Sequence, residues 1–275
     1  MKHWGKKPKD LYPRLVARLK NYTKGSKTPV KRAKSFTAEQ VLKFMQMPAM
    51  TRAEIQIRCC VALSFYGGLR TEELRNLRIE DVTQCSDGKI DVTYRASKSP
   101  EPEATRSFSV PLVPAHGNVW TNMVSKHLEN LKSDLGNDVK GAIARRTGKV
   151  KFTQQVLGKN SLYNFPKKLA LDVGIPAPEA QRYTGHSLRR TSAKCAADQG
   201  ANTFMLRRHF GWRSEQIPQR YVDNSEANNS VMAAILSGQG QPLQVPIALA
   251  QTQVRATESA AQQRIVLDIN INISK

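Results

Sequence analysis

The sequence predicts an α+β fold that is mainly α-helical and carries a small antiparallel β-sheet. Thr37 and Thr51 each begin a capping box followed by apolar residues, which is typical of a helix start. Two runs rich in Val, Ile, Tyr and Phe, 89–95 and 106–112, flank a polar turn and predict a hairpin. From residue 117 onward, helical patterns separated by glycines dominate.

Taken in order, the elements begin with a helix after Thr37 and a longer apolar helix after Thr51. The second helix ends at Gly67-Gly68, because glycine readily takes the left-handed conformation that closes a helix. A short helix over 72–77 follows, with acidic residues in its first turn. Beyond the hairpin, helices are expected at 118–134, 161–173, 187–199, 202–210 and 225–236.

The chain divides into three parts. Residues 1–34 read as a basic N-terminal arm, 35–236 as the folded domain, and 237–275 as a tether ending in a strand. The strand is predicted by strict alternation of Leu267, Ile269, Ile271 and Ile273 with polar residues. It could pair with the sheet edge of a neighbouring subunit or with the 89–112 hairpin of its own subunit.

Charge is the main compositional signal. The 275 residues hold 43 Lys and Arg against 22 Asp and Glu, a net charge of +21, and residues 1–34 hold 12 of these basic residues against one acid. A polyanion that contacts such a surface releases counterions, so nucleic acid is the expected partner. A charge excess that serves only solubility is the alternative.

The four cysteines lack CxxC spacing, which sets a zinc site aside. The longest nearly apolar stretch, 59–69, is too short to cross a bilayer.

Three separated segments carry candidate chemistry. Arg70 follows Gly67-Gly68 directly before a short helix, where an anion would be favoured. His186 and Arg189 lie three residues apart, so they share one helical face and could grip a phosphate. Trp212 and Tyr221 follow nine residues apart. Each segment taken alone also has a simpler structural interpretation. Arg70 could be a solvated surface residue, His186 a helix cap or packing residue, and Trp212 and Tyr221 core residues.

In combination, these segments resemble the catalytic domain of the tyrosine recombinases, the phage-integrase family. That family has an Arg in a G-L-R-x-x-E-L turn, a Lys in a β-hairpin, H-x-x-R, a G-[HW] pair and a Tyr nine residues later. The matching residues, within 36–236, are Arg70, Glu73, Lys98, His186, Arg189, Trp212 and Tyr221. Within the family, H-S-L-R-R-T, G-W-R-S and the segment Y-V-D-N-S are most similar to eukaryotic crypton-type recombinases of mobile elements.

The resemblance implies a site-specific DNA recombinase or integrase that cleaves and rejoins strands through a 3′-phosphotyrosyl intermediate. Tyr221 would be the nucleophile, while Arg70 and Arg189 would stabilise the transition-state charge. His186 would exchange the tyrosine proton and Lys98 would protonate the leaving 5′-oxygen. Trp212 would donate an indole N–H to the phosphate, and Glu73 would brace Arg70.

The expected partners are double-stranded DNA and further copies of the chain, as a dimer or tetramer on DNA. The resemblance implies neither a cofactor nor a metal, because positively charged side chains would supply the charge stabilisation that a metal ion would otherwise provide. Additional DNA contacts are expected from Arg145, Arg146, Lys149, Lys151 and Arg190. Crypton-like ancestry would place the protein in a nucleus, and otherwise it belongs in the cytoplasm or nucleoid. Two alternatives are a type IB topoisomerase and a non-catalytic DNA-binding protein of recombinase descent.

Deleting residues 1–34 is expected to lower DNA affinity and to flatten its dependence on salt, because phosphate-neutralising charges are removed. Each phosphate that the truncated protein no longer neutralises should reduce the slope of log K against log [salt] by about 0.9. Fluorescence anisotropy titrations of both proteins at several salt concentrations measure this slope. Equal slopes would show that the arm does not contact DNA.

Overall fold

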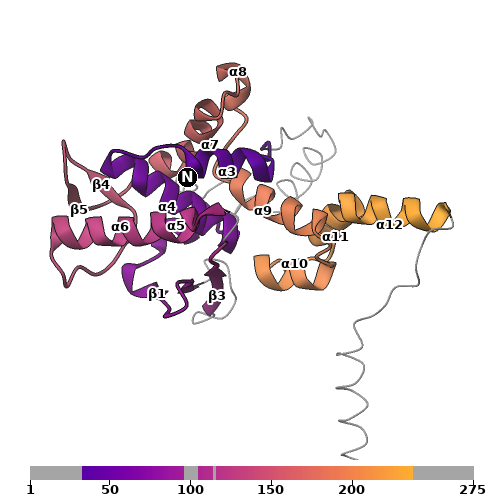
Figure 1. Cartoon of the computed structure of the whole chain (residues 1–275), viewed down its shortest axis with the longest axis horizontal. Helices are drawn as coiled ribbons and strands as arrows, with labels where there is room; N and C mark the ends of the chain where they lie inside the picture. Colours follow the sequence, from indigo (N-terminus) through magenta and orange to yellow (C-terminus); the bar gives the residue numbers. More distant parts are fainter. Residues whose placement is uncertain (1–32, 96–104, 114–115, 238–275) are drawn as a thin grey trace, which may run out of the picture.

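Helix α4 (Arg52–Gly67) is the element around which the fold is assembled, and most of its residues are buried. The computed structural model describes residues 33–95, 105–113 and 116–237. α4 contacts α3 (Ala38–Gln46), α6 (Val119–Leu135) and several later elements (Figure 1). The predicted capping boxes at Thr37 and Thr51 are both present. The predicted glycine stop is confirmed too, since Gly68 ends α4 in the left-handed conformation with φ 54°.

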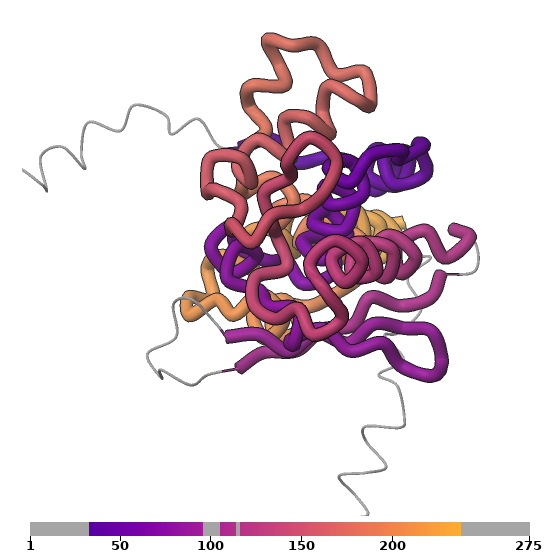
Figure 2. The backbone as a smooth tube through the Cα atoms, turned by 90° about the vertical axis from the view of Figure 1, so that its left-hand side faces the viewer, coloured from indigo at the N-terminus to yellow at the C-terminus, as the bar shows by residue number. Residues whose placement is uncertain are grey.

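A three-stranded antiparallel sheet lies beneath α4 and α6 in both views (Figures 1 and 2). Its central strand β2 (Ile90–Arg95) pairs with β1 (Val82–Gln84) and β3 (Thr105–Val110). The predicted hairpin is therefore confirmed, and β1 is a strand that the sequence did not predict. The expected C-terminal strand, like most of the N-terminal arm and the tether, lies outside the described residues.

A second, two-stranded sheet was also not predicted. It consists of β4 (Arg145–Thr147) and β5 (Phe152–Val156). Figure 1 shows this hairpin at the opposite end of the molecule from α11 (Gln216–Asp223) and α12 (Glu226–Leu236). The basic residues predicted to contact DNA in this stretch therefore lie far from the helix that carries Tyr221.

The remaining helices of the described residues fall into two groups. Those expected from the sequence are α5 (Thr71–Asn76), α7 (Lys159–Asp172), α9 (Ser187–Asp198) and α10 (Thr203–Phe210), together with α6 and α12. The one-turn helices η1 (Ile79–Asp81) and α8 (Ala177–Ala180) and the longer α11 were not expected. In the part of the chain that the structure describes, no helix has the length and apolar character to cross a membrane.

The described residues form two clusters of buried apolar side chains. The larger one joins α3–α7 with the three-stranded sheet. The smaller one contains only four buried apolar residues, from α9 and α10, with Trp212, Tyr221 and Val222 packed against them: Ala193, Ala197, Leu206 and Phe210. The helix that carries Tyr221 therefore rests on the smaller core.

Candidate active site

Arg189 is buried at the start of α9 and joins three parts of the chain. The residue is 6% exposed. Its Nη1 donates to the carbonyl oxygen of Gly68, and its Nη2 donates to that of Phe210. Nη1 also lies 3.9 Å from Oε2 of Glu73. One guanidinium therefore connects the segment of His186, the Gly67-Gly68 turn and the end of α10.

Glu73 holds Arg70 in place. Its Oε2 accepts from the backbone N–H of Arg70 at 2.8 Å, and its Oε1 accepts from Arg70 Nη1 at 2.6 Å. Burial acts to raise the pKa of Glu73, but the hydrogen bonds and charge of Arg70 leave it below the ordinary value. The carboxylate is therefore ionised at neutral pH, and it sits between the two arginines.

Burial also lowers the pKa of Arg189 to about 10, and the nearby charge of Arg70 acts in the same direction. Arg189 still carries its proton at neutral pH, because this pKa remains well above 7. Two guanidinium groups thus share one carboxylate, and the local charge is positive. Such a fixed positive centre suits an anion that gains charge during a reaction.

Close packing between glycines and their neighbours sets the arrangement of these segments. A Cβ at Gly68 would overlap the ring of Phe210, and one at Gly185 would overlap Oγ1 of Thr71. Thr71 Oγ1 also donates to the carbonyl oxygen of Gly185 at 3.3 Å. The Arg70 turn and the residue before His186 are therefore in direct contact.

An open groove of about 520 Å³ brings together the other candidates. His186, Arg189, Arg190, Trp212 and Tyr221 all line it. The Tyr221 ring lies parallel to that of Trp212, with centroids 5.5 Å apart and planes 5° apart. Trp212 in turn stacks on Phe210 at 4.8 Å. The Arg189 guanidinium lies 5.4 Å from the centroids of both the Phe210 and Trp212 rings.

The groove contains most of the predicted catalytic residues but not all of them. Arg70 is linked to the groove indirectly. It pairs with Glu73, and Glu73 lies 3.9 Å from the Arg189 side chain that lines the groove. Lys98 lies outside the described residues. His186 is the N-cap residue of α9, and its side chain is exposed beside the buried Arg189. Within the described residues, no group of three or more His, Cys, Asp and Glu side chains could hold a metal ion.

Arg145 is a correction to the predicted DNA contacts. It is 5% exposed, and its guanidinium donates to the carbonyl oxygens of Lys140, Ala142 and Gln154. Because these carbonyls occupy the guanidinium in the interior, Arg145 is a structural residue. Its neighbours Arg146, Lys149 and Lys151 are exposed on or beside the β4–β5 hairpin, away from the groove.

Arg106 is a residue that the sequence motifs missed. It lies on β3, opposite Tyr94 in the register. Its Nη1 donates to the carbonyl oxygen of Phe210 at 3.3 Å, the same oxygen that Arg189 contacts. Burial raises the pKa of the neighbouring Tyr94 phenol, so Tyr94 stays neutral. No motif indicates Arg106, because its role depends on strand register and tertiary packing.

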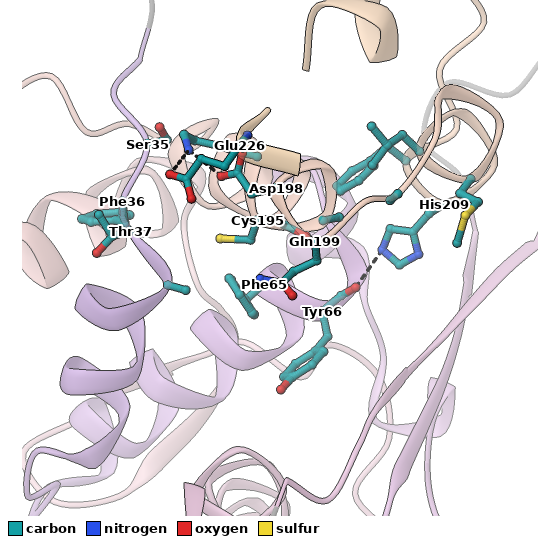
Figure 3. Close-up of a pocket in the computed structure, with 18 of the residues that line it drawn as sticks. Ser35, Phe36, Thr37, Phe65, Tyr66, Cys195, Asp198, Gln199, His209 and Glu226 are labelled. Atoms are coloured by element: carbon teal, nitrogen blue, oxygen red, sulfur yellow. Dashed lines mark hydrogen bonds and ion pairs between the residues drawn. The ribbon is translucent and has the colours of Figure 1, made fainter. Parts of the chain in front are cut away.

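A second and larger groove, of about 1030 Å³, lies between the start of α3 and helices α9 and α10 (Figure 3). Its apolar lining includes Phe65, Met205, Leu206 and Phe210. Figure 3 shows His209 at one side, bonded to the carbonyl oxygen of Tyr66 at 2.8 Å. On another side, the backbone N–H of Glu226 donates to Asp198.

Comparison with known proteins agrees with this fold. Residues 34–228 match the model of the phage integrase family. An integrase/recombinase xerD homolog of Selenomonas ruminantium is 25% identical over 167 residues, which are 60% of this chain and 46% of that protein. The chain thus spans about half the length of that curated relative.

Solved structures show the same fold at low identity. A XerH site-specific recombinase bound to a palindromic difH substrate, in a post-cleavage complex, aligns with a TM-score of 0.54 and 14% identity, covering 74% of this chain and 54% of that one. The XerA recombinase aligns with a TM-score of 0.50 and 16% identity, covering 75% and 64% respectively. The fold and the family match define a tyrosine-recombinase-type catalytic domain. The chain belongs to the phage integrase family.

Replacing Arg145 by Ala is expected to destabilise the protein by about 2 kcal/mol, because three carbonyls lose their donor. Urea unfolding followed by circular dichroism measures this change. The control, Arg146→Ala, removes an exposed arginine one residue away and should stay within about 0.5 kcal/mol of the parent. Equal stabilities for the two variants would contradict the structural role of Arg145.

Proposed function

We propose that this chain is the catalytic part of a site-specific DNA recombinase that cleaves and rejoins strands through Tyr221. The observation that carries the proposal is the groove in which Tyr221, His186 and Arg189 meet beside a positive cluster. The motif order and family membership support the same conclusion. Because the chain spans about half of its curated relative, the activity of the whole protein belongs to the proposal.

In the proposed reaction, the Tyr221 phenol attacks a DNA phosphorus. A bond forms between the tyrosine oxygen and phosphorus while the bond to the 5′-oxygen breaks, so no bond energy is lost to water. A tyrosine side chain in a model peptide has a pKa of about 10, so Tyr221 must release its proton during attack. His186, on the same groove, is the proposed acceptor. Lys98 is the proposed donor to the leaving oxygen.

The arginines are proposed to stabilise the transition state. Arg70 and Arg189 both pair with the carboxylate of Glu73, so two positive charges face one negative charge, and the excess is proposed to act on the phosphate oxygens. Trp212 is proposed to contact the phosphate through its indole N–H. Positive charge that is already fixed in place needs little reorganisation when the reaction begins.

Double-stranded DNA is the proposed partner. Arg190 lines the groove and is partly exposed, so its guanidinium is a proposed DNA contact. Arg146, Lys149 and Lys151 provide a separate exposed basic surface. The motifs H-S-L-R-R-T and G-W-R-S support the finer assignment to crypton-type recombinases and, with it, a nuclear location.

Tyr221→Phe is expected to abolish the covalent protein–DNA adduct and to change DNA affinity by less than about twofold, because only one hydroxyl is removed. The substitution keeps the ring that stacks on Trp212. A nicked substrate that traps the adduct, read on a denaturing gel, measures cleavage. Tyr163→Phe is the matched control and should retain the adduct. An adduct formed by the Tyr221→Phe variant at the parental rate would refute the assignment.

Assembly into a homo-oligomer is proposed from α12. This helix contains no buried residue, and four large apolar side chains on it are exposed: Val231, Met232, Ile235 and Leu236. Their spacing places them along one side of the helix. An exposed apolar stripe of this kind marks an interaction surface.

The proposed acceptor is the apolar groove between α3, α9 and α10 of a second copy. α12 begins at the edge of this groove in its own subunit, where Glu226 lines it. There the N-terminus of α12 is held by Asp198, which accepts from the backbone N–H of Glu226 at 3.0 Å. The Asn224–Ser225 junction between α11 and α12 is where the chain would redirect α12 toward a neighbour.

Replacing both Ile235 and Leu236 by Asp is expected to abolish higher-order complexes on paired DNA sites. The Tyr221 adduct on a half-site should persist, because these side chains lie outside the active groove. Native gels and denaturing gels report the two outcomes. Asn229→Asp with Ser230→Asp adds the same charge at exposed polar positions of α12 and serves as control. Intact paired complexes in the Ile235/Leu236 variant would refute the docking.

A further inference from the structure

Arg106 fastens the three-stranded sheet to the end of α10. It lies on β3, one pair from the Arg95↔Thr105 pair that ends the ladder. Its side chain reaches the α10 C-terminus, where Nη1 donates to the Phe210 carbonyl oxygen at 3.3 Å. That oxygen also accepts from Arg189, so two guanidinium groups converge on one carbonyl.

Gly211 shows how closely Arg106 packs there. A Cβ at position 211 would overlap Cζ, Nη1 and Nη2 of Arg106. The guanidinium therefore lies directly against the backbone of the residue that precedes Trp212. Gly211 also has φ 58°, a left-handed conformation that an L side chain rarely adopts.

The position of Trp212 depends on this turn. Its ring is stacked between Phe210 and Tyr221, and both aromatic contacts are nearly parallel. A shift of the Gly211 backbone would therefore move the surface on which the Tyr221 ring rests. Arg189 retains its own bonds to Gly68 and Phe210, so the fold does not depend on Arg106 alone.

We propose that Arg106 is a positioning residue for strand cleavage. It fixes the Phe210–Gly211–Trp212 turn, and through the Trp212 ring it sets the orientation of Tyr221. Its guanidinium holds the carbonyl of Phe210 and lies against Gly211, so its effect passes through the backbone of the turn. This role rests on the function proposed above.

The first experiment measures the single-turnover rate of adduct formation at saturating DNA. Arg106→Ala is expected to lower this rate about 10- to 100-fold, since small misplacements of a reacting group cost that much. Arg106→Lys, which keeps the charge and one donor, should recover part of the rate.

Arg208→Ala is the matched control. Arg208 lines the same shallow groove as Arg106, between β3 and α10, and is exposed. Its removal takes away the same charge from the same groove and should leave the saturated rate within about twofold. An unchanged rate in Arg106→Ala, or equal losses in the Arg106 and Arg208 variants, would overturn the proposal.

The second experiment is a double-mutant cycle read by thermal unfolding, which needs no activity. Gly211→Ala is expected to lower the melting temperature more in the parent than in the Arg106→Ala background, where the added methyl has room. The left-handed strain is the same in both backgrounds and cancels. Additive shifts would overturn the contact. If the parent itself forms no Tyr221-dependent adduct, the proposed function fails, while this cycle still decides whether Arg106 holds the turn.

Discussion

The arrangement of the site depends on how one buried guanidinium is satisfied. Burying a charge is unfavourable unless its hydrogen-bond donors have partners. Arg189 meets this requirement with carbonyl oxygens at two helix ends, Gly68 at the end of α4 and Phe210 at the end of α10. Helix ends leave such carbonyls without an internal partner, so the arginine and the two helices satisfy one another. The glycine that ends each helix allows the chain to turn away, which leaves these carbonyls accessible to Arg189.

The same requirement explains the positive character of the site. Arg70 and Arg189 both pair with the buried carboxylate of Glu73, and the charge of Arg106 is close enough to Arg189 to contribute to lowering its pKa. The pKa of Arg189 falls to about 10 because it is desolvated and near another arginine. Holding these like charges close together is unfavourable, and the free energy of folding offsets this repulsion before any ligand binds. An anionic ligand would relieve part of the repulsion, so the cluster favours a phosphate over a neutral group.

The sequence was most informative where structure is set by neighbours in the chain. Capping boxes at Thr37 and Thr51, the glycine after α4 and the β2–β3 hairpin all follow from local chemistry. Helix α11 was missed because Pro218 interrupts its pattern and its packing against α9 and α10 is not visible in a single segment. The spacing of the motifs indicated Arg70, His186, Arg189, Trp212 and Tyr221, but it could not show that Phe210 and Arg106 support them.

Arg145 shows a distinction that composition alone cannot make. Arg145 and Arg146 are adjacent in a basic run, and composition treats them alike. Alternation along β4 turns one inward to three carbonyls and leaves the other exposed. A basic run can therefore indicate a charged surface, but it cannot say which of its members belong to that surface.

The smaller of the two cores has a consequence for local stability. Among the described residues, four buried apolar side chains form the core beneath the Tyr221 helix, whereas most residues of α4 are buried. Regions with few buried apolar contacts open at a lower free energy than the rest of a protein. We therefore expect the helix that bears Tyr221 to open locally at a lower free energy than the main core. The thinness of the second core therefore makes the helix that bears Tyr221 the part of the described site with the least apolar support.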